Sequence, residues 1–196
     1  MKNTMKTIGL ATVTALALVG CGGGGGDTSD GYVAHPYDAP PISESLKNEY
    51  LTAVNNARAV GRTCGELGFF PAVPPLVWND GLYKSAYEHS EDMNVVGYFS
   101  HSGSGGASDW TAQVQELGRK STPAERIRNN TGDSEYGYLR SENLLREGSA
   151  SRSAAQATNS LLTSPYHCAG IMSQGIQEMG MANVGKYWAQ NFQGKS

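Results

Sequence analysis

The pattern of apolar positions predicts a helix over residues 43–61. Apolar side chains recur there every three or four positions, which is the spacing of one face of an α-helix. They are Leu46, Tyr50, Val54 and Ala57. Ser43 is placed to cap the N-terminus of this helix, and Gly61 to end it.

A second helix is predicted from Asp80, which we expect to be its cap, to Gly97. Its apolar face carries Leu82, Ala86, His89, Met93 and Val96. A histidine on an apolar helix face is typical of a hydrogen-bonded core residue, since buried polar groups need partners. We therefore interpret His89 as a core histidine.

The rest of the chain contains shorter elements. Short helices are expected at residues 108–118 and 122–130, and a strand within residues 136–148. A further helix, residues 151–163, must end before Pro165. The segment 177–194 divides at Asn183–Gly185 into two short strands, which is a hairpin signal. Helices followed by a hairpin predict an α+β domain in which helices cover an antiparallel sheet.

The N-terminus has the features of an export signal. Lys2 and Lys6 precede an apolar run of about a dozen residues, which is shorter than the about 20 that span a bilayer. The stretch "LVGC" is similar to a bacterial lipobox, so we expect residues 1–20 to be a lipoprotein signal peptide. Cys21 would then carry the lipid that anchors the protein in a membrane. Gly22, where a retaining aspartate could stand, favours the outer membrane. The alternative is an ordinary secreted protein with an incidental Cys21.

Composition separates a linker from a domain. Residues 21–42 are rich in Gly and Pro and cannot bury a core, so we expect a flexible tether followed by one domain, residues 43–196. The formal net charge is −3. Removal of the signal peptide takes away two lysines and no acidic residue, and therefore makes the charge more negative. No basic patch stands out, so nucleic acid is not an expected partner.

The cysteines favour one disulfide. If Cys21 is lipidated, Cys64 and Cys168 remain as a pair in an exported chain, where disulfides persist. Their bridge would close a loop of about 100 residues and contribute about 4–5 kcal/mol in the chain-entropy model. The alternative is a catalytic thiol at Cys168 with the adjacent His167 as its base. That alternative leaves Cys64 unpaired, and the bridge is favoured.

Six segments, taken in order, resemble the CAP superfamily of cysteine-rich secretory proteins, antigen 5 and pathogenesis-related 1 proteins. They read "AVNNARA", "PPLVWNDGLYKSAYEHSEDM", "YFSH", "SENLL", "SPYHCAGIM" and "YWAQNF". The resemblance implies a three-layer α–β–α sandwich with a central antiparallel sheet. It also implies a cleft lined by two histidines and two glutamates that can bind a divalent metal.

Three of these four residues have counterparts here, namely His101, Glu142 and His167. The fourth, a glutamate on the helix before the second histidine, has none, because residues 154–167 contain no carboxylate. Two imidazoles and one carboxylate are the His₂Glu set of catalytic zinc, so Zn²⁺ or another divalent ion is the expected cofactor of such a site. In the alternative interpretation the histidines hold loops in shape and Glu142 anchors a loop by hydrogen bonds.

The incomplete site favours a binding module over an enzyme. We therefore expect an envelope-anchored lipoprotein that binds a lipid, glycan, peptide or envelope protein. The alternative is a metal-dependent hydrolase or peptidase in which His101 and His167 are ligands and Glu142 is the catalytic base or third ligand. A third alternative is an envelope scaffold without a small ligand.

Overall fold

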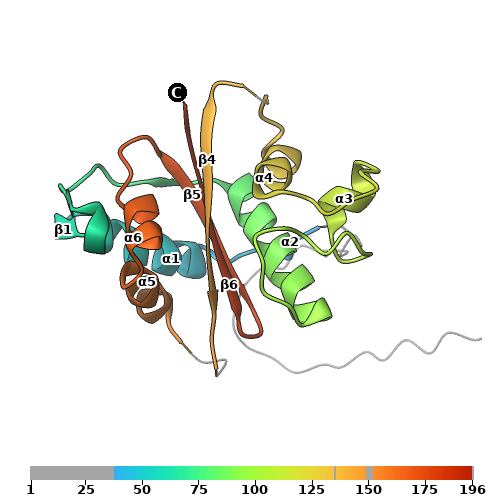
Figure 1. Cartoon of the computed structure of the whole chain (residues 1–196), viewed down its shortest axis with the longest axis horizontal. Coiled ribbons are helices and arrows are strands. Elements are labelled where there is room, and N and C mark those ends of the chain that lie inside the picture. Colours follow the sequence, from blue (N-terminus) through green and yellow to red (C-terminus); the bar gives the residue numbers. More distant parts are fainter. Residues whose placement is uncertain (1–37, 135, 149–151, 196) are drawn as a thin grey trace, which may run out of the picture. The chain divides into compact units, whose positions relative to one another are not determined.

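A four-stranded sheet lies between two layers of helices (Figure 1). The computed structural model describes residues 38–134, 136–148 and 152–195, which belong to one compact unit. The predicted signal peptide, Cys21 and most of the predicted linker lie outside the described residues. Among the residues that are described, no helix is long and apolar enough to cross a membrane.

The sheet has the strand order β3-β5-β6-β4. Its centre is the antiparallel hairpin of β5 (Glu178–Val184) and β6 (Tyr187–Lys195), which turns at Gly185 with a positive φ of 57°. The edge strand β4 (Tyr138–Arg146) pairs antiparallel with β6 along its whole length. At the other edge, β3 (Val77–Trp78) is only two residues long and pairs parallel with β5.

One layer contains α1 (Glu44–Arg58), α5 (Ala154–Leu162) and α6 (Pro165–Ile171). The other contains α2 (Asp80–Val96), α3 (Trp110–Val114) and α4 (Pro123–Thr131). In Figure 1 these two groups lie on opposite sides of the sheet. The predicted α–β–α sandwich is therefore confirmed, with β3 as the one parallel strand in an otherwise antiparallel sheet.

A small subdomain leaves the sandwich after α1. It consists of β1 (Arg62–Thr63), a 3-10 turn η1 (Gly65–Leu67) and β2 (Phe69–Phe70), which pairs with β1. The buried Cys64 forms a disulfide with Cys168 of α6, as predicted, and ties this subdomain to the helical layer. The sulfur of Cys168 is therefore not a free nucleophile.

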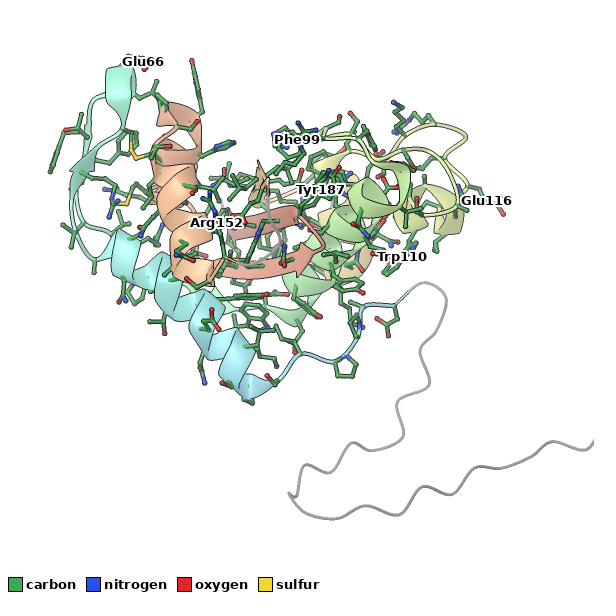
Figure 2. The ribbon with its side chains drawn as sticks, turned by 90° about the horizontal axis from the view of Figure 1, so that it is seen from below. Glu66, Phe99, Trp110, Glu116, Arg152 and Tyr187 are labelled. Atoms are coloured by element: carbon green, nitrogen blue, oxygen red, sulfur yellow. A yellow bond between two sulfur atoms is a disulfide. The ribbon has the colours of Figure 1, made fainter. Side chains whose placement is uncertain are left out.

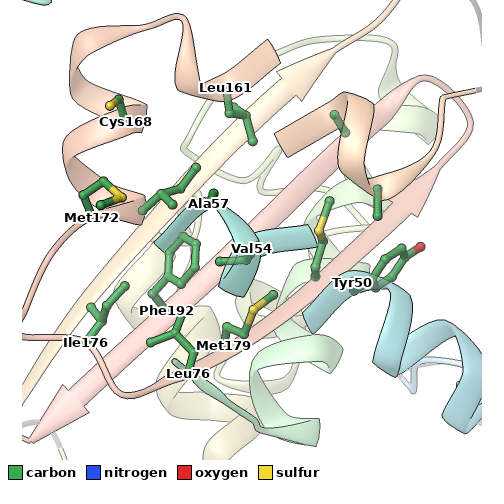
Figure 3. Packing of buried hydrophobic residues seen from close by; sticks show 14 of the residues in the cluster. Tyr50, Val54, Ala57, Leu76, Leu161, Cys168, Met172, Ile176, Met179 and Phe192 are labelled. Atoms are coloured by element: carbon green, nitrogen blue, oxygen red, sulfur yellow. The ribbon is translucent and has the colours of Figure 1, made fainter. Parts of the chain in front are cut away.

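The larger core lies between the sheet and the layer of α1, α5 and α6 (Figure 3). Val54 and Leu161 from the helices meet Met179 and Phe192 from the central strands, and all four are essentially inaccessible to water. On the opposite side α2 lies so close to β5 that a Cβ on Gly180 would be 2.0 Å from the backbone nitrogen of Tyr83. Only glycine allows this approach.

Several local expectations need correction. The cap of α2 is Asn79 rather than Asp80, because the Asn79 side chain accepts hydrogen bonds from the amides of Gly81 and Leu82. Pro165 does not only end a helix but begins α6, where a missing N–H costs nothing at the first position. Leu46 and Val96, which were placed on apolar helix faces, are exposed.

Candidate functional site

The three candidate residues come from three separate segments. His101 lies in the loop after α2, Glu142 in the middle of the edge strand β4, and His167 in the first turn of α6. Successive residues of a strand point to opposite sides. Glu142 accordingly contacts α4, whereas Asn143 donates a hydrogen bond to the backbone oxygen of His167 at 3.2 Å.

The structure brings His101 and Glu142 into direct contact. Nδ1 of His101 lies 2.9 Å from Oε1 of Glu142. The two side chains differ greatly in solvent access, because the imidazole is 55% exposed and the carboxylate only 1%. The histidine therefore lies at the surface, and the buried carboxylate fixes its orientation through this hydrogen bond.

Arg126 of α4 is the main partner of that carboxylate, and no sequence motif indicated this role. Its Nη2 atom lies 3.0 Å from Oε2 and 3.2 Å from Oε1 of Glu142. The same atom donates to the backbone oxygen of His101, and Nη1 donates to Ser121. Arg126 is 1% exposed, so this is a buried ion pair with several additional hydrogen bonds.

A third donor completes the surroundings of the carboxylate. The side-chain nitrogen of Asn191 on β6 donates a hydrogen bond to Oε2 of Glu142, 3.2 Å away. In this orientation the side-chain oxygen of Asn191 accepts hydrogen bonds from the Ser85 hydroxyl and the backbone amide of Ala86. Burial by itself raises the pKa of Glu142. The charge of Arg126 and the hydrogen bonds from His101 and Arg126 outweigh burial and lower that pKa to about 2.

His89 lies beneath this pair and is fully buried, as expected of a core histidine. Its Nε2 is 2.7 Å from the backbone oxygen of Ser100, which requires the proton to be on Nε2. Burial, together with the charge of Arg126, lowers the pKa of His89 against the opposing effects of Glu142 and Ser100. The ring is therefore neutral at pH 7 and helps to hold the loop that carries His101.

The same loop is fixed by buried carboxylates. Asp92 of α2 accepts hydrogen bonds from the amide and hydroxyl of Ser104 and from the hydroxyl of Ser108. Asp109 accepts from the amides of Gly105 and Ser121 at 2.9 and 3.0 Å. These contacts give His101 a defined position although its ring is exposed.

His167 is half-buried and near enough to His101 for the two to interact electrostatically. Burial and then the charge of His101 lower the pKa of His167, so its ring is neutral at pH 7. Within the described part of the chain, no hydrogen bond or ion pair joins its ring to Glu142. The structure thus joins two of the three candidate residues directly and places the third nearby.

The residues present do not fit a three-ligand metal centre. Among the described residues, no group of three or more His, Cys, Asp or Glu side chains is arranged to hold a metal ion. Both oxygens of Glu142 already accept from Arg126, and one also contacts His101. The structure thus does not assemble His101, Glu142 and His167 as three ligands of one metal ion. Metal binding by these residues stays a prediction.

Comparison with known proteins agrees with this fold. The family described as the cysteine-rich secretory protein family, CAP, matches residues 51–192. A solved extracellular protein containing an SCP domain from Bacillus anthracis str. Ames is 19% identical, with a TM-score of 0.51 over 80% of this chain and 45% of that protein. This chain thus spans less than half the length of the Bacillus protein.

An outer surface protein from Borrelia burgdorferi is 16% identical, with a TM-score of 0.51 over 76% of this chain and 96% of that one. At such identities the likeness concerns the fold alone. Comparison with curated proteins finds no match. The family match covers most of the chain and coincides with the α–β–α sandwich, and the chain therefore belongs to the CAP family of cysteine-rich secretory proteins.

Proposed function

We propose that this protein is an exported CAP-domain binding module, held at the cell envelope by a lipid on Cys21. The surface around His101 and His167 recognises a lipid, glycan, peptide or envelope protein. The observation that carries the proposal is the state of Glu142. Its carboxylate is buried, ionised and paired with Arg126. This leaves the exposed His101 as a recognition group rather than half of a hydrolytic site.

A hydrolase would need Glu142 in a different state. A general base must have a free lone pair and a pKa near the working pH. The pKa of Glu142 is about 2, and its oxygens accept from Arg126 and His101. A catalytic zinc, in turn, takes three protein ligands and leaves one position open. Here the only carboxylate of the three candidate residues is occupied by Arg126.

Exposed aromatic side chains beside the two histidines support recognition. Phe99, two residues before His101, is 45% exposed and stacks on Tyr187 with ring centroids 6.5 Å apart (Figure 2). Tyr166, next to His167, is 72% exposed. Large aromatic side chains are enriched at binding surfaces because they bury much area for little loss of conformational entropy.

Native mass spectrometry of protein purified from its own envelope tests the proposal. We expect a bound organic ligand on the wild type that is reduced in the Phe99→Ala/Tyr166→Ala variant. Phe69→Ala is the control, since Phe69 is an aromatic residue on β2 that is about as exposed as Tyr166. A ligand-free wild type would contradict the proposal, and so would a ligand retained equally by all three proteins.

The contact between His101 and Glu142 keeps a metal-dependent hydrolase as the second candidate. Zinc separates the two functions. We expect saturating zinc to leave the Tm unchanged, because no third ligand is free. A zinc-dependent rise in Tm that is lost in His101→Ala/His167→Ala, but kept in the control His35→Ala, would establish the metal site and favour the hydrolase.

The anchor is tested separately. Cys21→Ser removes the thiol that would carry the lipid, and we expect this variant to move from the membrane fraction to the soluble fraction. Membrane association that survives the substitution would contradict the lipid anchor. Separation of the membranes on a density gradient then tests the outer membrane as its location.

A further inference from the structure

A small apolar patch lies where α2 ends. Val95 and Val96, the last two residues of the helix, are 61% and 45% exposed. Phe99 follows after Gly97, which ends the helix in the left-handed conformation, and is 45% exposed. We call Val95, Val96 and Phe99 the α2-end patch. Large apolar side chains that are exposed close together indicate a surface that meets a partner.

The α2-end patch lies beside the turn of the β5–β6 hairpin. A Cβ on Gly185 in that turn would be 2.4 Å from the side-chain oxygen of Asn94, the residue before the patch. Phe99 stacks on Tyr187, the first residue after the turn (Figure 2). The end of α2 and the hairpin turn accordingly lie at the same end of the domain, the lower end in Figure 1.

Two exposed cations border the patch. Lys186 belongs to the turn, and its Nζ atom lies 5.6 Å from the ring centroid of Tyr187, on which Phe99 stacks. Arg146, at the end of β4, is opposite Tyr187 in the register of the sheet. It shares the α2 side of the sheet with Glu142, because alternate residues of a strand point to the same side. Within the described ranges, neither cation forms an ion pair with a carboxylate.

The partner that fits this surface is both apolar and anionic. The protein as a whole is acidic, with a formal net charge of −3, and Glu91 at the rim of the patch is half-buried. A second copy of the chain fits poorly, because a two-fold dimer would place the patch against itself and the cations against cations. A bilayer of anionic lipids offers negative headgroups above an apolar interior, which matches both features.

The chain enters the domain on the same helix. Asp38, the first described residue, forms an ion pair with Lys84 of α2 at 2.9 Å. Val95 is about 16 Å further along this helix. Residues 22–37 connect the entry point to Cys21, and a flexible chain of that length has a mean end-to-end distance of about 20–25 Å. A membrane to which Cys21 is fixed is therefore within reach of the patch.

We propose that the α2-end patch docks on the surface of an anionic lipid bilayer. Val95, Val96 and Phe99 enter the headgroup region, and Arg146 and Lys186 lie against the lipid phosphates. The inference rests on the lipid anchor of the proposed function, which supplies the membrane, and adds a fixed orientation of the domain on it. The anchor makes this second contact intramolecular, so a weak contact suffices to orient the domain.

Cosedimentation with vesicles tests the proposal on the mature chain with Cys21→Ser, so that the result does not depend on the anchor. The vesicles contain phosphatidylglycerol and phosphatidylcholine in equal amounts, or phosphatidylcholine alone. We expect saturable binding to the mixed vesicles at millimolar lipid, and much weaker binding to phosphatidylcholine alone. Val95→Ser/Val96→Ser is expected to weaken binding to the mixed vesicles about tenfold, since it removes apolar surface that enters the bilayer.

Val60→Ser/Leu67→Ser is the matched control. Val60 and Leu67 are 61% and 38% exposed and lie just before β1 and on η1, away from α2. This variant should bind like the unchanged chain. Arg146→Gln/Lys186→Gln should lose the preference for the anionic vesicles. An unchanged backbone amide spectrum verifies that each variant is folded.

The proposal is overturned if the mixed vesicles do not bind the chain, or if Val95→Ser/Val96→Ser binds as tightly as the control. It is also overturned if Arg146→Gln/Lys186→Gln keeps the preference for anionic vesicles. Sedimentation equilibrium without vesicles is the last arm, because a dimer that Val95→Ser/Val96→Ser dissociates would assign the patch to a second copy instead. These variants leave Phe99 and His101 unchanged, so docking, ligand recognition and the anchor can each fail alone.

Discussion

The carboxylate of Glu142 lies in a layer of buried polar groups between β4 and α4, and its chemistry depends on the neighbouring Arg126. A buried ion pair contributes little net stability compared with apolar residues of the same size, because both charges lose their hydration. Removal of one partner has a larger effect, since the other charge remains buried and uncompensated. Here Arg126 also bonds the backbone oxygen of His101, so it supports the position of the exposed histidine.

A double-mutant cycle measures this dependence. We expect Arg126→Met to lower the free energy of unfolding by about 3–5 kcal/mol, because it leaves Glu142 unpaired. Arg126→Met/Glu142→Leu should recover a large part of that loss. Urea denaturation provides the measurement. Arg119→Met is the control, since the Arg119 side chain of the Arg119–Glu125 pair is 54% exposed and its removal should change stability little. A double variant as unstable as the single one would show that the charge of Glu142 is not the cause.

His101, Glu142 and His167 could be identified from the sequence because each lies in a short motif that resembles the CAP superfamily. Arg126 could not, because its role depends on a contact between α4 and β4 that no local pattern reveals. In the sequence it is an ordinary charged residue of a predicted short helix. The contact between Arg126 and Glu142 could therefore be recognised only from the packing of α4 on β4.

At the scale of elements, α2 organises the loop that follows it. Glu88 and Asp92 point from α2 into the region of residues 100–111, where they accept hydrogen bonds from Thr111 and Ser104. Asp109, at the start of α3, closes the same loop from the other side. A loop rich in Gly and Ser is thereby held by carboxylates rather than by apolar packing.

This arrangement makes the loop sensitive to acid. Burial raises the pKa of Asp109, but hydrogen bonds from Ser121 and the amides of Gly105 and Ala112 prevail and lower it. A lowered carboxyl pKa stabilises the fold above the unfolded-state value of about 3.9, and this contribution is lost as the pH falls below it. We expect hydrogen exchange of residues 102–121 to show less protection in Asp109→Asn than in the wild type at pH about 6, with the gap narrowing towards pH about 3.

Glu88 acts in the opposite direction, because burial raises its pKa despite hydrogen bonds from Thr111 and Asn130. Its contribution to stability is present at low pH and is lost as the pH rises through its raised pKa.

For the Asp109→Asn comparison, hydrogen exchange in α1, which is distant from this loop in the sequence, serves as the internal control. A gap between wild type and Asp109→Asn that is independent of pH would contradict the role given to Asp109.

Periodicity identified the long elements and missed the local ones. The two long helices and the final hairpin stand out because their apolar positions repeat over many residues. Helix α6 was missed because Pro165 signals both the end of one helix and the start of the next. Strand β4 was predicted only in part, because Glu142 and its polar neighbours interrupt the alternation that marks a half-buried strand.

At the scale of the whole molecule, the disulfide joins parts that are 104 residues apart in the sequence. In the chain-entropy model a loop of that length contributes about 4–5 kcal/mol, by restricting the unfolded chain. The bridge holds the subdomain of β1, η1 and β2 against α6. Cys64 and Cys168 are buried, so their removal also loses apolar contacts.

We expect Cys64→Ala/Cys168→Ala to fold and to have a free energy of unfolding lower by about 4–5 kcal/mol than the oxidised wild type. Chemical denaturation measures the difference. The wild type in reducing buffer is the control and should be at least as stable as the double variant, because it keeps the two buried sulfur atoms. Equal stability of the oxidised and reduced wild type would contradict the prediction, and thiol labelling verifies the redox state in each sample.

The strand order β3-β5-β6-β4 has a consequence for how the domain comes into being. Its central pair, β5 and β6, contains the last two strands of the domain to be synthesised. The helices of the sandwich pack against a sheet that cannot form until these two strands are present. A chain emerging from the ribosome or a translocation channel therefore gains its core only when residues 178–195 have followed. Until then the helices that pack on this pair lack the strands that bury their apolar faces.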